Sequence, residues 1–149
     1  MRRPDKRATL ALFLAFFAFA LLASAVASQS APKTAAIPLD KRPYVLVVYA
    51  DWCPYCQDLK PVLALINDKY RGRIRFVRYD VTSDETTAKS KELAAKLGLT
   101  KFFEDNQEKT SLVIILDASR HEVFRATSDN EAKHYEAVLD QQLQSVATH

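Results

Sequence analysis

The stretch Trp52-Cys53-Pro54-Tyr55-Cys56 contains both cysteines of this 149-residue chain. An apolar run over residues 44–50 leads into it, and an apolar stripe at helical spacing over residues 57–70 follows it. The cysteines therefore fall at a strand-to-helix junction. Unpaired N–H groups and the positive end of the helix dipole stabilise a thiolate there. We expect Cys53 to be the nucleophile, and Cys56, one turn further along the same face, to form a disulfide with it.

A Cys-x-x-Cys pair is also half of a zinc site, but a zinc site needs about four ligands. The chain has no second cysteine pair, and its three histidines, His121, His134 and His149, lie far downstream without ligand spacing. A purely structural disulfide is also disfavoured, because so short a loop restricts the unfolded chain little. The sequence therefore favours redox chemistry and predicts neither a bound metal nor a cofactor.

The first 27 residues have the pattern of a secretory signal. Four basic residues lie within the first seven positions, residues 8–27 are almost wholly apolar, and Ala25-Val26-Ala27 provides a small-x-small cleavage site before Ser28. An uncleaved membrane anchor is the alternative, because about 20 apolar residues can span a bilayer. Both interpretations predict a periplasmic or otherwise extracytoplasmic protein, in a compartment where a cysteine pair stays reduced only if a partner reduces it.

The remainder is predicted to be a linker and one domain. Residues 28–43 contain three prolines and read as a tether, and residues 44–149 have the length of a single domain. Residues 1–27 hold four of the 21 basic and one of the 18 acidic residues, so 17 of each remain. A near-neutral domain has no general electrostatic attraction for nucleic acid.

The apolar patterns predict an α/β domain in the order β-α-β-α-β-β-α. Residues 44–50 and 111–116 are apolar almost throughout, which suits central strands buried on both faces. The runs over 74–79 and 123–126 mix apolar and polar residues, as edge strands do. The resulting order in the sheet is second, first, third, fourth. Residues 100–110 read as a long polar loop, from which Phe102 and Phe103 fold back onto the core.

This order and the cysteine motif together resemble the thioredoxin family. The segment from Tyr49 to Cys56 is similar to the active-site segment of periplasmic and membrane-anchored thioredoxin-like proteins, and Pro61 falls where these proteins have a proline in the same helix. The resemblance covers roughly residues 44–146. It implies a minimal thioredoxin fold with a central four-stranded mixed sheet flanked by helices. It also implies a nucleophilic Cys53, a resolving Cys56, and a contact surface for substrate formed by Trp52, Pro54 and Tyr55.

The sequence departs from the family pattern at two places near the cysteines. The acid that many thioredoxins bury in the first core strand is replaced by Val47, and the nearby Asp51 and Asp58 are expected to be surface charges. The family's cis-proline at the start of the third core strand is also missing, and Thr110 (or Ser111) takes its place. A cis bond without proline costs about 3–4 kcal/mol, so we expect a trans bond. A hydroxyl at this position could hydrogen-bond a thiolate.

The sequence thus predicts a protein-disulfide oxidoreductase, with reduction the favoured direction, that exchanges disulfides with protein substrates. A membrane-bound or soluble redox partner would recycle the pair, and the N-terminal segment, if retained, would tether the domain to a membrane. Two alternatives belong to other classes. One is a soft-metal module that binds Cu(I) through the same two cysteines. The other is a partner-binding protein in which the disulfide is incidental.

Overall fold

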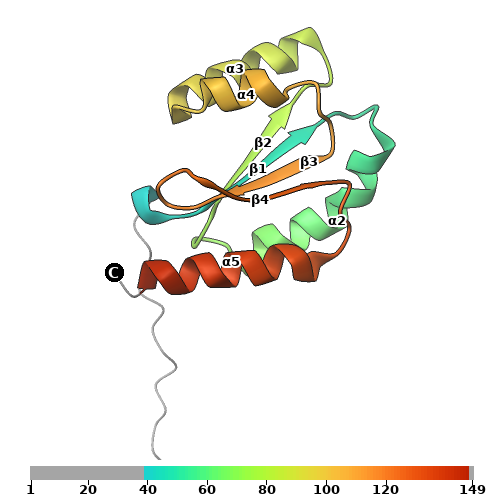
Figure 1. The fold of residues 1–149 in the computed structure, drawn as a ribbon. Coiled ribbons are helices and arrows are strands. Elements are labelled where there is room, and N and C mark those ends of the chain that lie inside the picture. Colours follow the sequence, from blue (N-terminus) through green and yellow to red (C-terminus); the bar gives the residue numbers. More distant parts are fainter. Residues whose placement is uncertain (1–38, 148–149) are drawn as a thin grey trace, which may run out of the picture. The chain divides into compact units, whose positions relative to one another are not determined.

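The computed structural model describes residues 39–147 (Figure 1). The predicted signal or anchor over residues 1–27 and most of the predicted linker lie outside the described residues. The described part begins with a short 3-10 helix, η1 (Leu39–Lys41), just before the first strand. No helix between residues 39 and 147 is long and apolar enough to cross a membrane.

Four strands form one mixed sheet in the described part of the chain. The order across the sheet is β2-β1-β3-β4, with β1 and β2 parallel and the other two pairs antiparallel. This is the order predicted from apolarity, with the two most apolar strands at the centre. The bounds are β1 Tyr44–Tyr49, β2 Arg75–Asp80, β3 Leu112–Leu116 and β4 Glu122–Thr127.

Helices cover both faces of this sheet, and together with the strand order they confirm the predicted thioredoxin fold. Figure 1 shows α2 and α5 on one side of the sheet and α3 and α4 on the other. The four helices are α2 (Pro54–Lys69), α3 (Asp84–Leu97), α4 (Thr100–Asn106) and α5 (Ala132–Ala147). Pro61 lies inside α2, which continues for eight residues beyond it.

The central strand β1 supplies side chains to two separate cores. Because side chains alternate along a strand, Val45 and Val47 pack with α2 and α5, whereas Leu46 and Val48 pack with α3 and α4. All six residues of β1 are buried. Burial on both faces explains why this stretch of the sequence is apolar at every position.

The segment predicted as a polar loop instead contains α4, so that prediction was wrong. A left-handed Gly98 ends α3, and α4 begins two residues later without a side-chain cap at its start. One aromatic side chain anchors α4: Phe103 is fully buried, and its ring centroid lies 5.2 Å from that of Tyr79. Among seven mostly polar residues only Phe103 and Asn106 are buried, so the segment shows almost no helical periodicity of apolar residues. The expected return of Phe102 and Phe103 to the core is confirmed, since Phe102 also packs against Tyr79.

Candidate redox-active site

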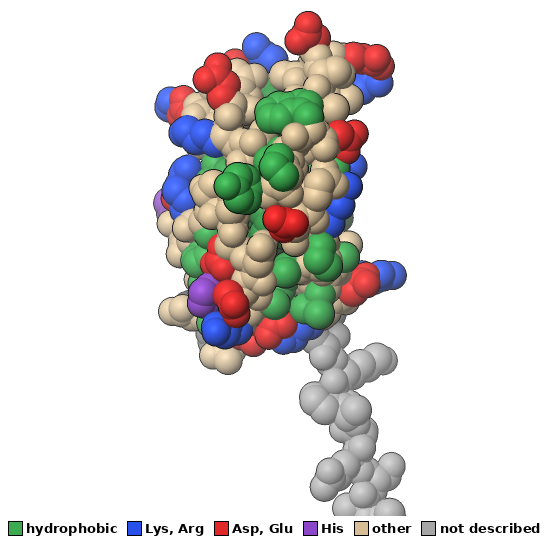
Figure 2. Space-filling view, turned by 90° about the vertical axis from the view of Figure 1, so that its right-hand side faces the viewer, with side chains coloured by type: hydrophobic (Ala, Val, Ile, Leu, Met, Phe, Trp, Pro, Cys, Tyr) green, Lys and Arg blue, Asp and Glu red, His purple; other side chains and the backbone are tan. Residues whose placement is uncertain are grey.

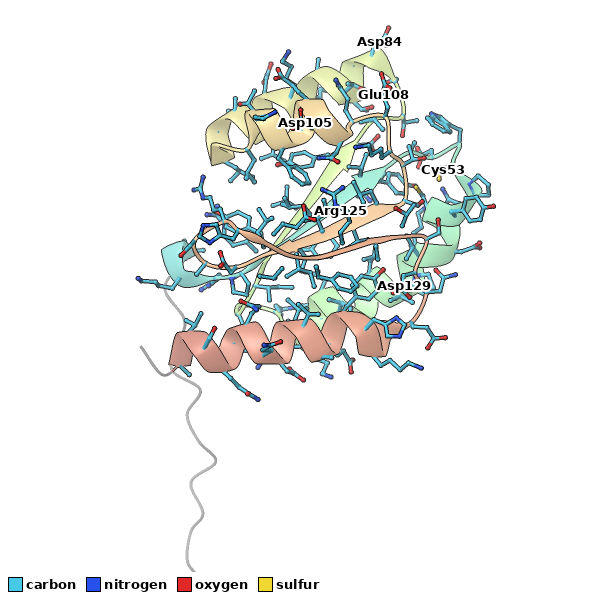
Figure 3. The ribbon with its side chains drawn as sticks, in the orientation of Figure 1. Cys53, Asp84, Asp105, Glu108, Arg125 and Asp129 are labelled. Carbon is cyan, nitrogen blue, oxygen red and sulfur yellow. The ribbon has the colours of Figure 1, made fainter. Side chains whose placement is uncertain are left out.

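The two cysteines lie where β1 passes into α2, as the sequence predicts. Figure 3 shows Cys53 at this end of the sheet. Cys53 is the N-cap residue of α2, and Pro54 takes the first helical position, where its missing N–H costs nothing. Both cysteines are in the thiol form, and both are almost fully buried. The fold therefore holds the pair just beneath the surface at the helix start.

Neutral hydrogen-bond donors stabilise the thiolate form of Cys53. The Cys56 backbone N–H donates to the Cys53 sulfur at 3.3 Å. Burial by itself would raise the pKa of Cys53, but hydrogen bonds from the Cys56 thiol, the Thr110 hydroxyl and the backbone at Cys56 and Tyr55 outweigh burial and lower that pKa. The thiolate, which is the nucleophilic form, is thus favoured at this cysteine.

The pKa of Cys56 is raised, whereas that of Cys53 is lowered. Burial, followed by the interaction with Cys53, raises the pKa of Cys56 to about 11, and backbone groups at Ala50 and Ser111 offset this only in part. Its sulfur lies 4.0 Å from the Val48 carbonyl oxygen. At neutral pH Cys56 therefore keeps its proton, and the two cysteines differ in acidity.

No carboxylate helps to deprotonate Cys56 in the described structure. Val47, at the position of the family's buried acid, is packed in the core. Asp51 and Asp58 are both exposed, as expected from the sequence, and neither is among the groups that shift the pKa of Cys56. The Asp51 carboxylate instead accepts a hydrogen bond from the Tyr49 hydroxyl. No acidic side chain is therefore among the groups that shift the pKa of Cys56.

Two hydrogen-bonded serines hold the backbone at the start of β3, where the family has its cis-proline. No peptide bond between residues 39 and 147 is cis, in agreement with the expected trans bond. Ser111 adopts the left-handed conformation (φ 62°), and Ser128, at the end of β4, does the same (φ 57°). The two hydroxyl oxygens lie 2.8 Å apart, and the Ser128 N–H donates to the Ser111 carbonyl at 3.1 Å. These bonds offset the cost of the strained backbone, about 1–3 kcal/mol for each residue.

The Ser111 backbone also ties this segment to the strand that carries the cysteines. The Ser111 N–H, which a proline would lack, donates to the Val48 carbonyl at 2.9 Å. This bond places Thr110 beside Cys53. The sequence predicted Thr110 at this position, but the partnership of Ser111 with Ser128, seventeen residues away, left no signal in the sequence.

The remaining predicted contact residues lie together on the surface around the cysteines. Trp52 and Tyr55 are 64% and 61% exposed, which is high for aromatic side chains, and Pro54 is also exposed. Figure 2 shows hydrophobic side chains along the middle of the face onto which the β1–α2 junction opens, with most charged side chains toward its edges. The Trp52 indole N–H donates to the Thr82 carbonyl at 3.2 Å, which fixes the exposed ring.

A hollow of about 430 Å³ lies beside Trp52. Sequence reasoning did not predict it, because its walls come from four separated segments of the chain: the β1–α2 junction, the end of β2, α3 and the α4–β3 loop. The lining residues are Trp52, Val81, Thr87, Gln107, Glu108 and Thr110. We call this hollow the Trp52 groove.

The histidines take no part in this site. His121 and His134 are exposed and pair with Asp117 and Asp129, and His149 lies outside the described residues. Among residues 39–147, no group of three or more histidine, cysteine or acidic side chains could hold a metal ion.

Comparison with known proteins identifies the family. The thioredoxin family profile matches residues 28–120, and the chain belongs to this family. It is 43% identical over 51 residues to thioredoxin C-2 of Corynebacterium nephridii, covering 34% of this chain and 47% of that protein. It is 40% identical over 68 residues to the thiol:disulfide interchange protein TxlA of Synechococcus elongatus, covering 46% and 35%. The chain thus spans less than half the length of these relatives.

Solved structures of thioredoxins and thioredoxin-like proteins are also similar, at low sequence identity. A thioredoxin-like protein solved in its oxidized form matches with a TM-score of 0.49 and 18% identity, covering 70% of this chain and 80% of that one. Trxlp from Edwardsiella tarda matches with a TM-score of 0.46 and 17% identity, covering 68% and 84%.

The Thr110 hydroxyl makes a testable contribution to the site. Replacing Thr110 with valine keeps the side-chain shape and removes a donor to Cys53, so the pKa of Cys53 should rise and its thiolate fraction at neutral pH should fall. The pH dependence of thiolate absorbance at 240 nm and of alkylation by iodoacetamide measures this change. Thr127→Val, on the exposed side of β4, is the matched control. Identical titrations for wild type and Thr110→Val would show that the hydroxyl does not act on Cys53.

Proposed function

We propose that this protein is an extracytoplasmic thiol–disulfide oxidoreductase that reduces disulfides in protein substrates. The observation that carries the proposal is the asymmetry of the pair: Cys53 has a lowered pKa at the start of α2, and Cys56 behind it has a raised one. Such a pair has an attacking thiolate and a protonated thiol held in reserve, which is what a two-step exchange reaction needs.

The reaction proceeds in two exchanges. The Cys53 thiolate attacks one sulfur of the substrate disulfide, so that a bond forms between Cys53 and that sulfur and the second substrate sulfur leaves as a thiolate. The Cys56 thiol then loses its proton, which the departing thiolate can accept, and the Cys56 sulfur attacks Cys53. The mixed disulfide breaks, the remaining substrate sulfur leaves as a thiolate that takes a proton from water, and Cys53 and Cys56 are left oxidised as a disulfide.

The donors around Cys53 favour the reducing direction. A strongly oxidising pair is one whose reduced form is unusually stable, and positive charge next to the thiolate is an effective way to stabilise it. The groups that lower the pKa of Cys53 are a thiol, a hydroxyl and backbone N–H groups, all of them neutral. No positively charged group is among them, and this supports a reducing pair over a strongly oxidising one.

The surface around the pair supports a protein substrate. Trp52, Pro54 and Tyr55 expose apolar area next to a buried sulfur, and exposed aromatic residues of this kind are typical of protein contact sites. Thr110 also lies beside Cys53, where its hydroxyl reaches the sulfur. A substrate segment that delivers a disulfide to Cys53 would pass between these residues.

The extracytoplasmic location rests on residues 1–27, whose basic, apolar and small-residue regions follow one another in the order of a secretory signal. Outside the cytosol the oxidised pair would need electrons from a membrane-bound or soluble redox partner. Fractionation of cells that express the full chain tests the location. Replacing Leu12 and Leu14 with arginine, which interrupts the apolar run, should keep the protein in the cytosol, and an unchanged distribution would contradict the proposal.

Trapping the mixed disulfide tests the roles of the two cysteines. Cys56→Ser removes the resolving thiol, so a protein or peptide disulfide should become covalently attached to Cys53. Cys53→Ser should form no adduct under the same conditions, with a metal chelator present. Mass spectrometry before and after treatment with dithiothreitol identifies the adduct and shows that it is a disulfide. Adducts on Cys56 in the Cys53→Ser variant at a similar rate would contradict the assigned roles.

A further inference from the structure

The Trp52 groove lies next to Cys53, which is not itself one of its lining residues. Two of its lining residues, Trp52 and Thr110, flank Cys53: Trp52 precedes it in the chain, and the Thr110 hydroxyl hydrogen-bonds to it. A substrate whose disulfide reaches Cys53 would therefore place the residues next to its cysteine over this groove. This step rests on the function proposed above.

The residues that line the groove include one acidic side chain and no basic one. Glu108 is the one ionisable side chain that lines it, and Glu108 is exposed and has no ion-pair or hydrogen-bond partner in the described structure. The adjacent Lys109 is directed elsewhere, since its ammonium donates to the Asp105 carbonyl at 2.9 Å and to the Asn106 side chain at 3.2 Å.

The surroundings of the groove do not neutralise Glu108. On α3, Lys89 is paired with Glu85 and Lys91 with Glu104. Asp84, at the start of α3, is another exposed carboxylate without a described partner. Figure 3 shows Asp84 and Glu108 on the same side of the molecule as Cys53. A ligand in the groove thus meets an unneutralised carboxylate within a largely polar wall.

We propose that Glu108 gives the protein a preference for substrates that carry arginine or lysine within two residues of the cysteine that Cys53 attacks. The long apolar stem of such a residue would pack on the exposed Trp52 ring, and the cationic head would reach the Glu108 carboxylate. The Thr87 and Gln107 side chains add oxygen atoms that can accept its remaining N–H groups. Glu108 is therefore assigned as a specificity-determining residue that lies away from the reacting sulfurs.

Peptide disulfides that differ by one residue test this assignment. Three symmetric disulfide dimers of a short glycine-rich peptide would carry arginine, glutamine or glutamate before the cysteine. The rate at which the reduced protein cleaves each dimer is divided by the rate with dithiothreitol, because the neighbouring charge also changes the intrinsic reactivity of the disulfide. The same series is measured for Glu108→Gln, Glu108→Lys and Glu92→Lys. Glu92 is an exposed, unpaired residue of α3 outside the groove, so its variant is the control for net charge.

The wild type should cleave the arginine dimer about three- to five-fold faster than the glutamine dimer at low salt, which is the effect of one partly exposed ion pair. High salt should reduce this ratio. Glu108→Gln should abolish the preference, Glu108→Lys should reverse it in favour of glutamate, and Glu92→Lys should keep the wild-type order.

Two results would overturn the assignment while leaving the proposed function intact. One is equal normalised rates for all three dimers with the wild type. The other is an equal change of preference in Glu92→Lys and Glu108→Lys, which would indicate net charge alone. The proposed function itself fails if the reduced wild type cleaves none of the dimers and the Cys56→Ser variant forms no adduct with them. The assignment of Glu108 then fails with it.

Discussion

The hydrogen bond from the Cys56 backbone N–H to the Cys53 sulfur connects the fold to the chemistry. It exists because Cys53 is the N-cap residue of α2. Helix α2 starts only a few residues after the end of β1, so the position of the strand determines where the helix begins. The strand is held on both faces by packed side chains and on both edges by neighbouring strands. The helix start is therefore fixed in space, and a sulfur placed on it meets donors that do not have to reorganise when the thiolate forms.

The start of β3 shows how this chain keeps the same arrangement without a proline. A proline would fix the backbone but could not donate to Val48. Here Ser111 donates to Val48, and its strained conformation is held by Ser128. Thr110 therefore lies next to the cysteines, and its hydroxyl is one of the hydrogen-bond donors around Cys53. The departure from the family pattern thus changes the groups next to Cys53 and leaves the sheet order intact.

Sequence reasoning predicted what depends on local pattern. The apolar runs that became β1 and β3 identified the central strands, and the cysteine motif was correctly placed at the strand-to-helix junction. The position of Thr110 near the cysteines was predicted because the sequence has no proline where the family has its cis-proline. The failures depend on contacts between distant segments. Helix α4 is stabilised by one buried ring against Tyr79, the Ser111–Ser128 pair joins two strand ends, and the Trp52 groove joins four segments. None of these has a periodic signature.

The reduction potential of the Cys53–Cys56 pair tests the central claim most directly. We would equilibrate residues 28–149 in glutathione and dithiothreitol buffers with metal chelated, and follow the oxidised fraction by thiol labelling. For a reductase we expect one reversible two-electron transition at about −270 mV, in the range of reducing thioredoxins. A value near about −120 mV would indicate an oxidant, and a pair that does not cycle reversibly would contradict the oxidoreductase function.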